Sequence, residues 1–155
     1  MKIESLKKII SSGESITVEF KESKKKINKD VYDSVCAFLN RHGGHLFLGV
    51  KDNGDIAGVD KDSVDQLKKD FVTSLNNPQT LNPAFYLAVE DVEIDGKTIL
   101  YINVPESSQV HRCKGKIFDR NEDGDFDITN NTNLVSGLYM RKQATYTENR
   151  IFPYA

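Results

Sequence analysis

Apolar and polar residues recur along the chain with two different periods. Helical spacing of the apolar positions predicts helices over residues 4–10, 30–41 and 63–75. Alternation of apolar and polar positions predicts strands over residues 17–21, 86–94 and 97–104, and Asp95-Gly96 between the last two is a strong hairpin signal. The nearly continuous apolar run from His45 to Val50 is typical of a buried central strand.

After Pro105 the pattern weakens. We expect strands over residues 114–118 and 137–141, with a polar loop between them. No internal repeat or long linker divides the 155 residues, so we predict one domain over residues 1–155. Its expected fold class is α+β, with a single mixed β-sheet and two main amphipathic helices packed against it.

The composition is that of a globular protein, with 38% apolar and 28% charged residues. No run approaches the roughly 20 apolar residues that cross a bilayer, and the N-terminus lacks the apolar stretch of a signal peptide. Two distant cysteines give neither a disulfide framework nor a zinc site. We therefore expect a cytoplasmic protein.

Charge is unevenly distributed, although the formal net charge is only −2. Five lysines cluster within residues 21–29, and acidic residues cluster within residues 119–127. A protein that simply coats DNA would be strongly basic, so the net charge argues mildly against nucleic acid as a partner. The hypothesis of nucleic-acid binding depends on the lysine cluster.

Ordered sequence blocks between residues 14 and 58 carry a family resemblance. They are Glu14-Ser-Ile-Thr-Val-Glu19-Phe-Lys-Glu-Ser, Cys36-Ala-Phe-Leu-Asn40, Gly43-Gly44-His-Leu-Phe-Leu-Gly49-Val-Lys-Asp52-Asn-Gly54 and Ile56-Ala-Gly58-Val. Together they resemble the core signature of the Schlafen AlbA-like domain. Leu138-Tyr-Met-Arg141 resembles the strand that usually closes these domains, and residues 119–133 look like an acidic insertion. The resemblance implies nucleic acid, RNA or DNA, as a partner. It also implies a homodimer, because the vertebrate Schlafen core is a clamp of two such lobes.

The same resemblance implies a carboxylate trio. Endoribonuclease members of the family use two glutamates five residues apart and an aspartate, and Glu14, Glu19 and Asp52 match these positions. Three converging carboxylates would require a hard cation such as Mg²⁺ or Mn²⁺, which could activate water. The alternative is that these side chains are solvated at the strand edge. A metal-dependent endoribonuclease is thus one hypothesis, and a binding domain without turnover is the other.

Basic residues could track a phosphate backbone. The candidates are Lys21, Lys24, Lys25, Lys26, Lys29, Arg41, Arg112, Lys114, Lys116 and Arg141. Tyr139 could stack on a base. The alternatives are a solvated lysine loop and a protein-interaction domain that binds no nucleic acid.

Three further motifs bear on cofactors. The run from Asp119 to Asp127 resembles the start of a calcium loop, with Asp119, Asn121, Asp123 and Asp125 as candidate ligands, but Asn130 stands where a bidentate glutamate is needed. His111-Arg-Cys113 is half of the zinc motif of vertebrate Schlafen cores, and the other half is missing. No phosphate-binding glycine loop followed by Lys-Ser or Lys-Thr occurs, so no nucleotide cofactor is indicated.

Overall fold

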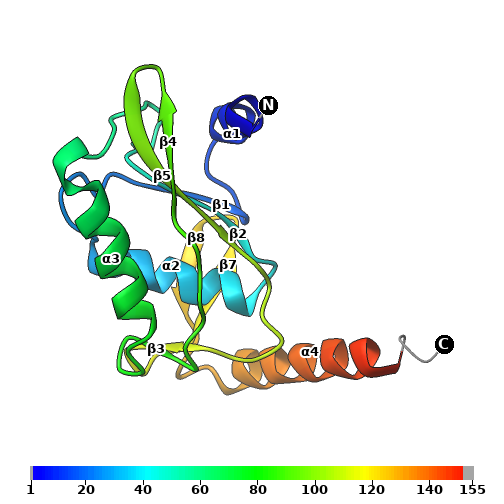
Figure 1. Cartoon of the computed structure of the whole chain (residues 1–155). Helices are drawn as coiled ribbons and strands as arrows, with labels where there is room; N and C mark the ends of the chain where they lie inside the picture. The colour runs from blue at the N-terminus through cyan, green and yellow to red at the C-terminus, as the bar shows by residue number, and fades with distance from the viewer. Residues whose placement is uncertain (1, 152–155) are drawn as a thin grey trace.

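A four-stranded mixed sheet lies at the centre of the computed structural model, which describes residues 2–151 of the chain and the side chains of residues 2–144 (Figure 1). Its strands, in spatial order, are β1 (Val18–Lys21), β2 (Gly44–Leu48), β5 (Lys97–Val104) and β4 (Glu90–Ile94). β1 and β2 are parallel, and the other two pairs are antiparallel. The predicted α+β class with a mixed sheet is confirmed. The strand expected over residues 86–94 is shorter, because it begins at Glu90.

Helices cover both faces of this sheet (Figure 1). Two amphipathic helices, α2 (Lys29–Asn40) and α3 (Val64–Leu75), share one core with Leu46 and Leu48 of β2. The 3₁₀ turn η1 (Lys61–Ser63) precedes α3. On the opposite face, α1 (Lys2–Ser11) packs in a second core with Phe47 of β2. Because both faces of β2 are buried, its sequence is continuously apolar, as the pattern predicts.

Two glycines make the connection between α2 and β2. Gly43 has φ 74°, and a Cβ there would lie 2.4 Å from the carbonyl oxygen of Val104. A Cβ on Gly44 would lie 2.4 Å from the ring of Phe38. Only glycine fits at these two positions, so the tight reversal from helix to buried strand depends on both.

The region after Pro105 differs from the prediction. A short pair joins β3 (Leu81–Asn82) to β6 (Arg112–Cys113), and the hairpin of β7 (Phe118–Asn121) and β8 (Gly124–Asp127) replaces the expected polar loop. The strand predicted over residues 114–118 is wrong, because positive φ angles at Lys114 (51°) and Gly115 (81°) form a turn there. Arg112, Lys114 and Lys116 therefore do not share one strand face.

The strand predicted over residues 137–141 is also wrong, because these residues lie in the long helix α4 (Thr132–Ile151), which runs along one end of the molecule (Figure 1). The side-chain oxygen of Asn131 accepts a hydrogen bond from the backbone N–H of Leu134 at 3.1 Å, which caps the helix N-terminus. Val135 and Leu138, three residues apart, pack in a third core with Ile117 and Ile128. No helix within the described residues is long and apolar enough to span a bilayer.

Candidate functional site

Two members of the predicted carboxylate trio lie together at the start of β1. The Glu14 carboxylate accepts a hydrogen bond from the backbone N–H of Phe20 at 3.1 Å, which turns it back over the strand. The Glu19 carboxyl is within hydrogen-bonding reach of Glu14. The five-residue spacing therefore places these two acidic side chains next to each other.

The positive charge opposite Glu19 comes from Arg120 on β7. Its Nη1 donates to Glu19 Oε1 at 2.8 Å and to Asp125 Oδ1 at 2.7 Å. The rest of the guanidinium donates to three backbone carbonyls before and within β1, those of Ser15, Ile16 and Val18. The guanidinium also lies over the Phe38 ring, 4.5 Å from its centroid. Arg120 is only 1% exposed, so it joins the hairpin to β1 and α2 from inside the protein.

Burial and the neighbouring acid set the protonation of this cluster. Burial and the hydrogen bond with Glu14 raise the pKa of Glu19 from 4.5 to about 7, against the lowering effects of Arg120 and Lys21. Burial also raises the pKa of Asp125, although Ser34 and Arg120 hydrogen-bond to it. One buried guanidinium thus binds two partly buried carboxyl groups, those of Glu19 and Asp125.

Asp52 does not join Glu14 and Glu19. It is exposed in the turn after β2. Among the described residues, no three His, Cys, Asp or Glu side chains are grouped so that they could hold a metal ion. Because Arg120 already occupies Glu19 Oε1, this arrangement does not fit a divalent cation bound by Glu14, Glu19 and Asp52.

The run that resembles a calcium loop is the β7–β8 hairpin. Asp119 accepts two hydrogen bonds from Arg41, at 3.0 and 2.8 Å, and lies 3.5 Å from Arg141. Asn121 accepts from the backbone N–H of Asp123 at 2.8 Å in the turn. Asp125 is bonded to Arg120. The side-chain oxygens of Asp119, Asn121 and Asp125 thus accept hydrogen bonds from arginines or within the turn, and within the described residues they are not grouped as a metal site.

The half zinc motif lies in the protein interior. The two ring nitrogens of His111 are hydrogen-bonded, at 2.8 Å to the carbonyl of Pro83 and at 2.7 Å to the Ser107 hydroxyl. Burial lowers the pKa of His111. Burial and a hydrogen bond to Asp33 raise the pKa of Cys113. Both side chains therefore have structural partners.

The predicted basic residues divide into two groups. Lys21 pairs with Asp30 at 2.9 Å, and Arg41 and Arg141 pair with Asp119. In contrast, the loop between β1 and α2 (residues 22–28, here the lysine loop) exposes three side chains without an ion-pair partner among the described residues: Lys24, Lys25 and Lys26.

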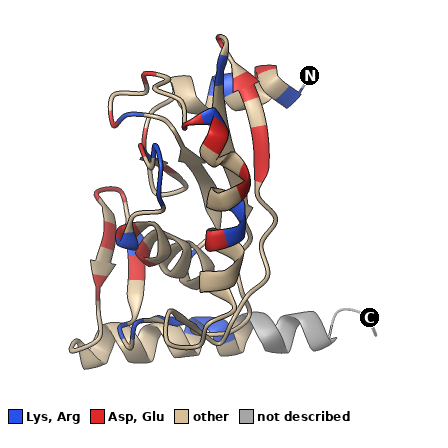
Figure 2. Ribbon diagram, turned by 60° about the vertical axis from the view of Figure 1, so that its left-hand side comes forward, with Lys and Arg blue, Asp and Glu red and all other residues tan. Residues whose placement is uncertain are grey.

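A second basic segment adjoins the lysine loop. Lys114 Nζ donates to the carbonyl of Lys29 at 3.1 Å and lies 3.3 Å from the Asp33 carboxylate. Arg112 and Lys116, on either side of Lys114, are exposed. Figure 2 shows the charges in segments, with acidic residues on β4 and on the β7–β8 hairpin and basic residues on the loop after β1.

Sequence reasoning missed Arg120, the most connected side chain of this region. A usable signal was present, since Arg120 is the only Lys or Arg between Lys116 and Arg141 and stands in an acidic run. Such an isolated cation suggests a buried counter-charge, but its partner Glu19 lies 101 residues away and could not be identified from local pattern.

These features define an α+β domain with a mixed sheet, a buried arginine–carboxylate cluster beside β1 and an exposed lysine loop after it. The model of the family described as "Schlafen, AlbA_2" matches residues 14–129, and the chain belongs to this family. The match includes the β7–β8 hairpin. A search of curated proteins gave no match.

Two solved structures are similar. The DIP2311 protein of Corynebacterium diphtheriae is 20% identical, with a TM-score of 0.60 over 81% of this chain, which shows the shared fold. This chain spans 29% of that protein. The N-terminal domain of a Nitrosomonas europaea protein, whose name relates it to the ATP-dependent DNA helicase RecG, is 28% identical, with a TM-score of 0.51. That match covers 67% of this chain and 72% of the other.

Proposed function

We propose that this chain is a nucleic-acid-binding domain whose interface is the lysine loop together with the neighbouring Arg112–Lys116 segment. Membership of the Schlafen AlbA_2 family and likeness to a domain of a RecG-related protein support the proposal. The observation that carries it is the exposure of Lys24, Lys25 and Lys26 without ion-pair partners among the described residues.

Lysines without ion-pair partners are suited to a polyanion because they neutralise phosphates without first breaking an internal ion pair. Each phosphate that they neutralise releases condensed counterions, and this release favours binding. The contact of Lys114 with the Lys29 carbonyl joins the two basic segments into one surface. Lys21, Arg41 and Arg141 are already paired with carboxylates, so we expect smaller contributions from these three.

Salt-dependent binding tests this function. Fluorescence anisotropy with a short labelled RNA hairpin and a DNA duplex would be measured over a series of salt concentrations. We expect the double variant Lys25→Ala/Lys26→Ala to reduce the slope of log K against log salt by about 1.8 on the DNA duplex, the value for two lost phosphate contacts. Lys8→Ala/Lys69→Ala removes the same charge at exposed sites on α1 and α3 and serves as the control.

Equal slopes for the two double variants would contradict the interface. If the wild type binds neither nucleic acid at low salt, a protein-interaction domain becomes the better hypothesis. Adding Mn²⁺ or Mg²⁺ to the same RNA also tests the endoribonuclease hypothesis. Cleavage that survived Glu19→Ala and Asp52→Ala would exclude the carboxylate trio as its site.

The homodimer also stays a proposal. A second lobe would complete a basic groove, and light scattering of the protein with and without RNA tests it. A monomer under both conditions would contradict it.

A further inference from the structure

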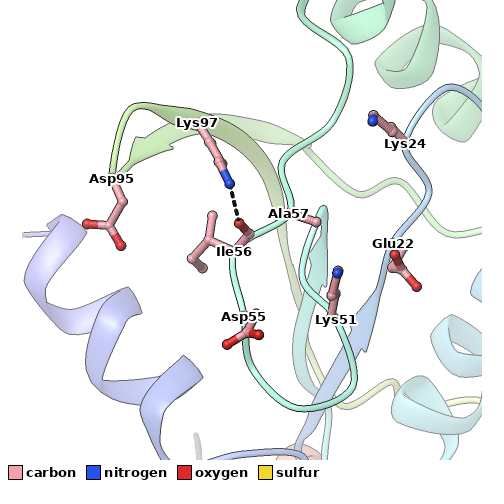
Figure 3. A pocket seen from close by; sticks show the side chains of 8 residues that line it. All are labelled: Glu22, Lys24, Lys51, Asp55, Ile56, Ala57, Asp95 and Lys97. Carbon is pink, nitrogen blue, oxygen red and sulfur yellow. Dashed lines mark hydrogen bonds between the residues drawn. The ribbon is translucent and has the colours of Figure 1, made fainter.

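An open pocket of about 670 Å³ lies at the edge of the sheet where the parallel strands β1 and β2 end (Figure 3). Its walls are the segment after β1, the loop after β2 and the turn that begins β5, and the candidate site described above uses only one of its side chains, Lys24. The crevice beyond the carboxyl ends of strands is a common place for ligands in sheets of this kind. The volume is in the range of small-molecule sites.

Three lysines from three different segments line this pocket: Lys24, Lys51 and Lys97. Lys24 and Lys51 have no side-chain partner among the described residues. Lys97 Nζ donates to the carbonyl of Ile56 at 3.2 Å, which holds its charge at the wall. Two ammonium groups without partners that enter one pocket favour an anionic group there.

The remaining lining differs from a plain phosphate site. Ile56 and Ala57 supply an apolar wall, and three carboxylates also line the pocket. In Figure 3, Asp55 and Asp95 lie on the α1 side, and Glu22 lies with Lys24 on the segment that follows β1. Asp95 pairs with Lys7 at 3.6 Å. The Asp55 carboxylate accepts a hydrogen bond from the Asn53 side-chain amide at 3.1 Å, and the Asp55 backbone N–H donates to the Asn53 side-chain oxygen at 3.0 Å. Cationic, apolar and hydrogen-bond-accepting walls match the phosphate, base and ribose of one nucleotide.

The wall between Glu22 and Lys24 is strained. Ser23 has φ 37°, a left-handed conformation that is unfavourable for a residue with a Cβ. The residue is only 3% exposed, and its buried hydroxyl lacks a hydrogen-bond partner within the described part of the chain. Strain and an unsatisfied polar group together indicate a segment whose geometry serves a site rather than stability.

We propose that this pocket receives one unstacked nucleotide of a single RNA strand. Lys24 and Lys51 contact its phosphate, Ile56 and Ala57 contact its base, and Asp55 accepts a hydrogen bond from the ribose 2′-hydroxyl, the group that distinguishes RNA from DNA. This inference rests on the proposed nucleic-acid binding and deepens it. Lys24 belongs to both sites, so a strand that crosses the lysine loop can place one nucleotide in the pocket.

The test compares binding of three probes: a single-stranded RNA of about twelve nucleotides, the DNA strand of the same sequence, and the DNA duplex. For Lys51→Ala we expect single-strand RNA affinity to fall roughly fivefold, with duplex affinity changed no more than in the Lys8→Ala control. Ala57→Phe fills the pocket without a change of charge and should weaken single-strand binding while circular dichroism shows a folded protein. Asp55→Ala removes the proposed acceptor for the 2′-hydroxyl and should reduce the preference for RNA over DNA.

The same binding measurements separate a wrong pocket assignment from an absence of nucleic-acid binding. If duplex binding stays sensitive to Lys25→Ala/Lys26→Ala while Lys51→Ala and Ala57→Phe bind the RNA strand as the wild type does, only the pocket assignment is overturned. If the wild type binds none of the probes, the proposed function fails as well. Addition of AMP tests whether the pocket that holds a nucleotide of the RNA strand also binds a free nucleotide. Competition of AMP with the RNA strand supports the nucleotide pocket, and AMP binding that leaves strand affinity unchanged overturns it.

Discussion

Arg120 Nη1 lies 2.8 Å from Glu19 Oε1, so that a strand near the N-terminus and a hairpin 101 residues later share one partly buried ion pair. The same nitrogen donates to Asp125 at 2.7 Å. The Arg120 side chain is 1% exposed, and its guanidinium also donates hydrogen bonds to three backbone carbonyls. Arg120 therefore supplies the positive charge beside the Glu19 and Asp125 carboxylates, and its contacts attach the β7–β8 hairpin to the sheet.

Replacement of Arg120 by Met should destabilise the protein by about 3–5 kcal/mol, because the Glu19 and Asp125 side chains, only 13% and 15% exposed, would lose their shared counter-charge. Urea unfolding measures this loss. Arg112→Met, at an exposed position of the neighbouring strand β6, is the control and should change the free energy of unfolding by less than about 0.5 kcal/mol. Equal effects of the two substitutions would contradict the structural role of Arg120.

Glu19 should make the protein less stable as the pH rises. Its pKa is raised from 4.5 to about 7, so the folded chain holds this proton more tightly than the unfolded chain. The contribution of the protonated group is complete below pH 4.5 and is lost as the pH rises through about 7. The lowered pKa values of His45 and His111 act in the opposite direction in this window, so the measurement is the difference between wild type and Glu19→Gln.

Glu19→Gln keeps an oxygen for Arg120 but cannot titrate. We expect its free energy of unfolding, relative to that of the wild type, to increase between pH 5 and pH 7. A difference that is constant over this range would show that Glu19 is ionised in the folded protein throughout it.

The local sequence pattern was sufficient to predict elements whose structure depends on their own residues. The continuous apolar run of β2 and the Asp95-Gly96 turn predicted a buried strand and a hairpin, and both are present. Pattern was insufficient where the partner is distant. Arg120 gains its role from Glu19, and no local rule connects residues 101 positions apart. For residues 137–141, a strand was predicted from the family resemblance. The sequence also holds helix signals there, namely the three-residue spacing of Val135 and Leu138 and the capping residue Asn131.

Gly137→Ala tests the conformation of that segment. In the helix α4 the residue has ordinary φ, and a Cβ would meet nothing within 4 Å. Alanine is favoured over glycine in a helix interior by about 1 kcal/mol, so the variant should be more stable by about that amount in urea unfolding. Gly43→Ala is the counterpart, because its Cβ would lie 2.4 Å from the Val104 carbonyl, and we expect a loss of stability. A destabilising Gly137→Ala would contradict the helix.

Ser23 offers a way to separate strain from function. Its φ of 37° disfavours any residue with a Cβ, and its buried hydroxyl lacks a partner within the described residues. Ser23→Ala removes only the hydroxyl, whereas Ser23→Gly removes the hydroxyl and the Cβ. Relief of a left-handed backbone conformation is worth of order 1 kcal/mol, so we expect Ser23→Gly to be the more stable of the two variants by roughly that amount in urea unfolding. If the strain positions Glu22 and Lys24 for a ligand, the stabilised Ser23→Gly protein should bind single-stranded RNA less tightly than Ser23→Ala. Equal stability of the two variants would show that the conformation of Ser23 stores no strain.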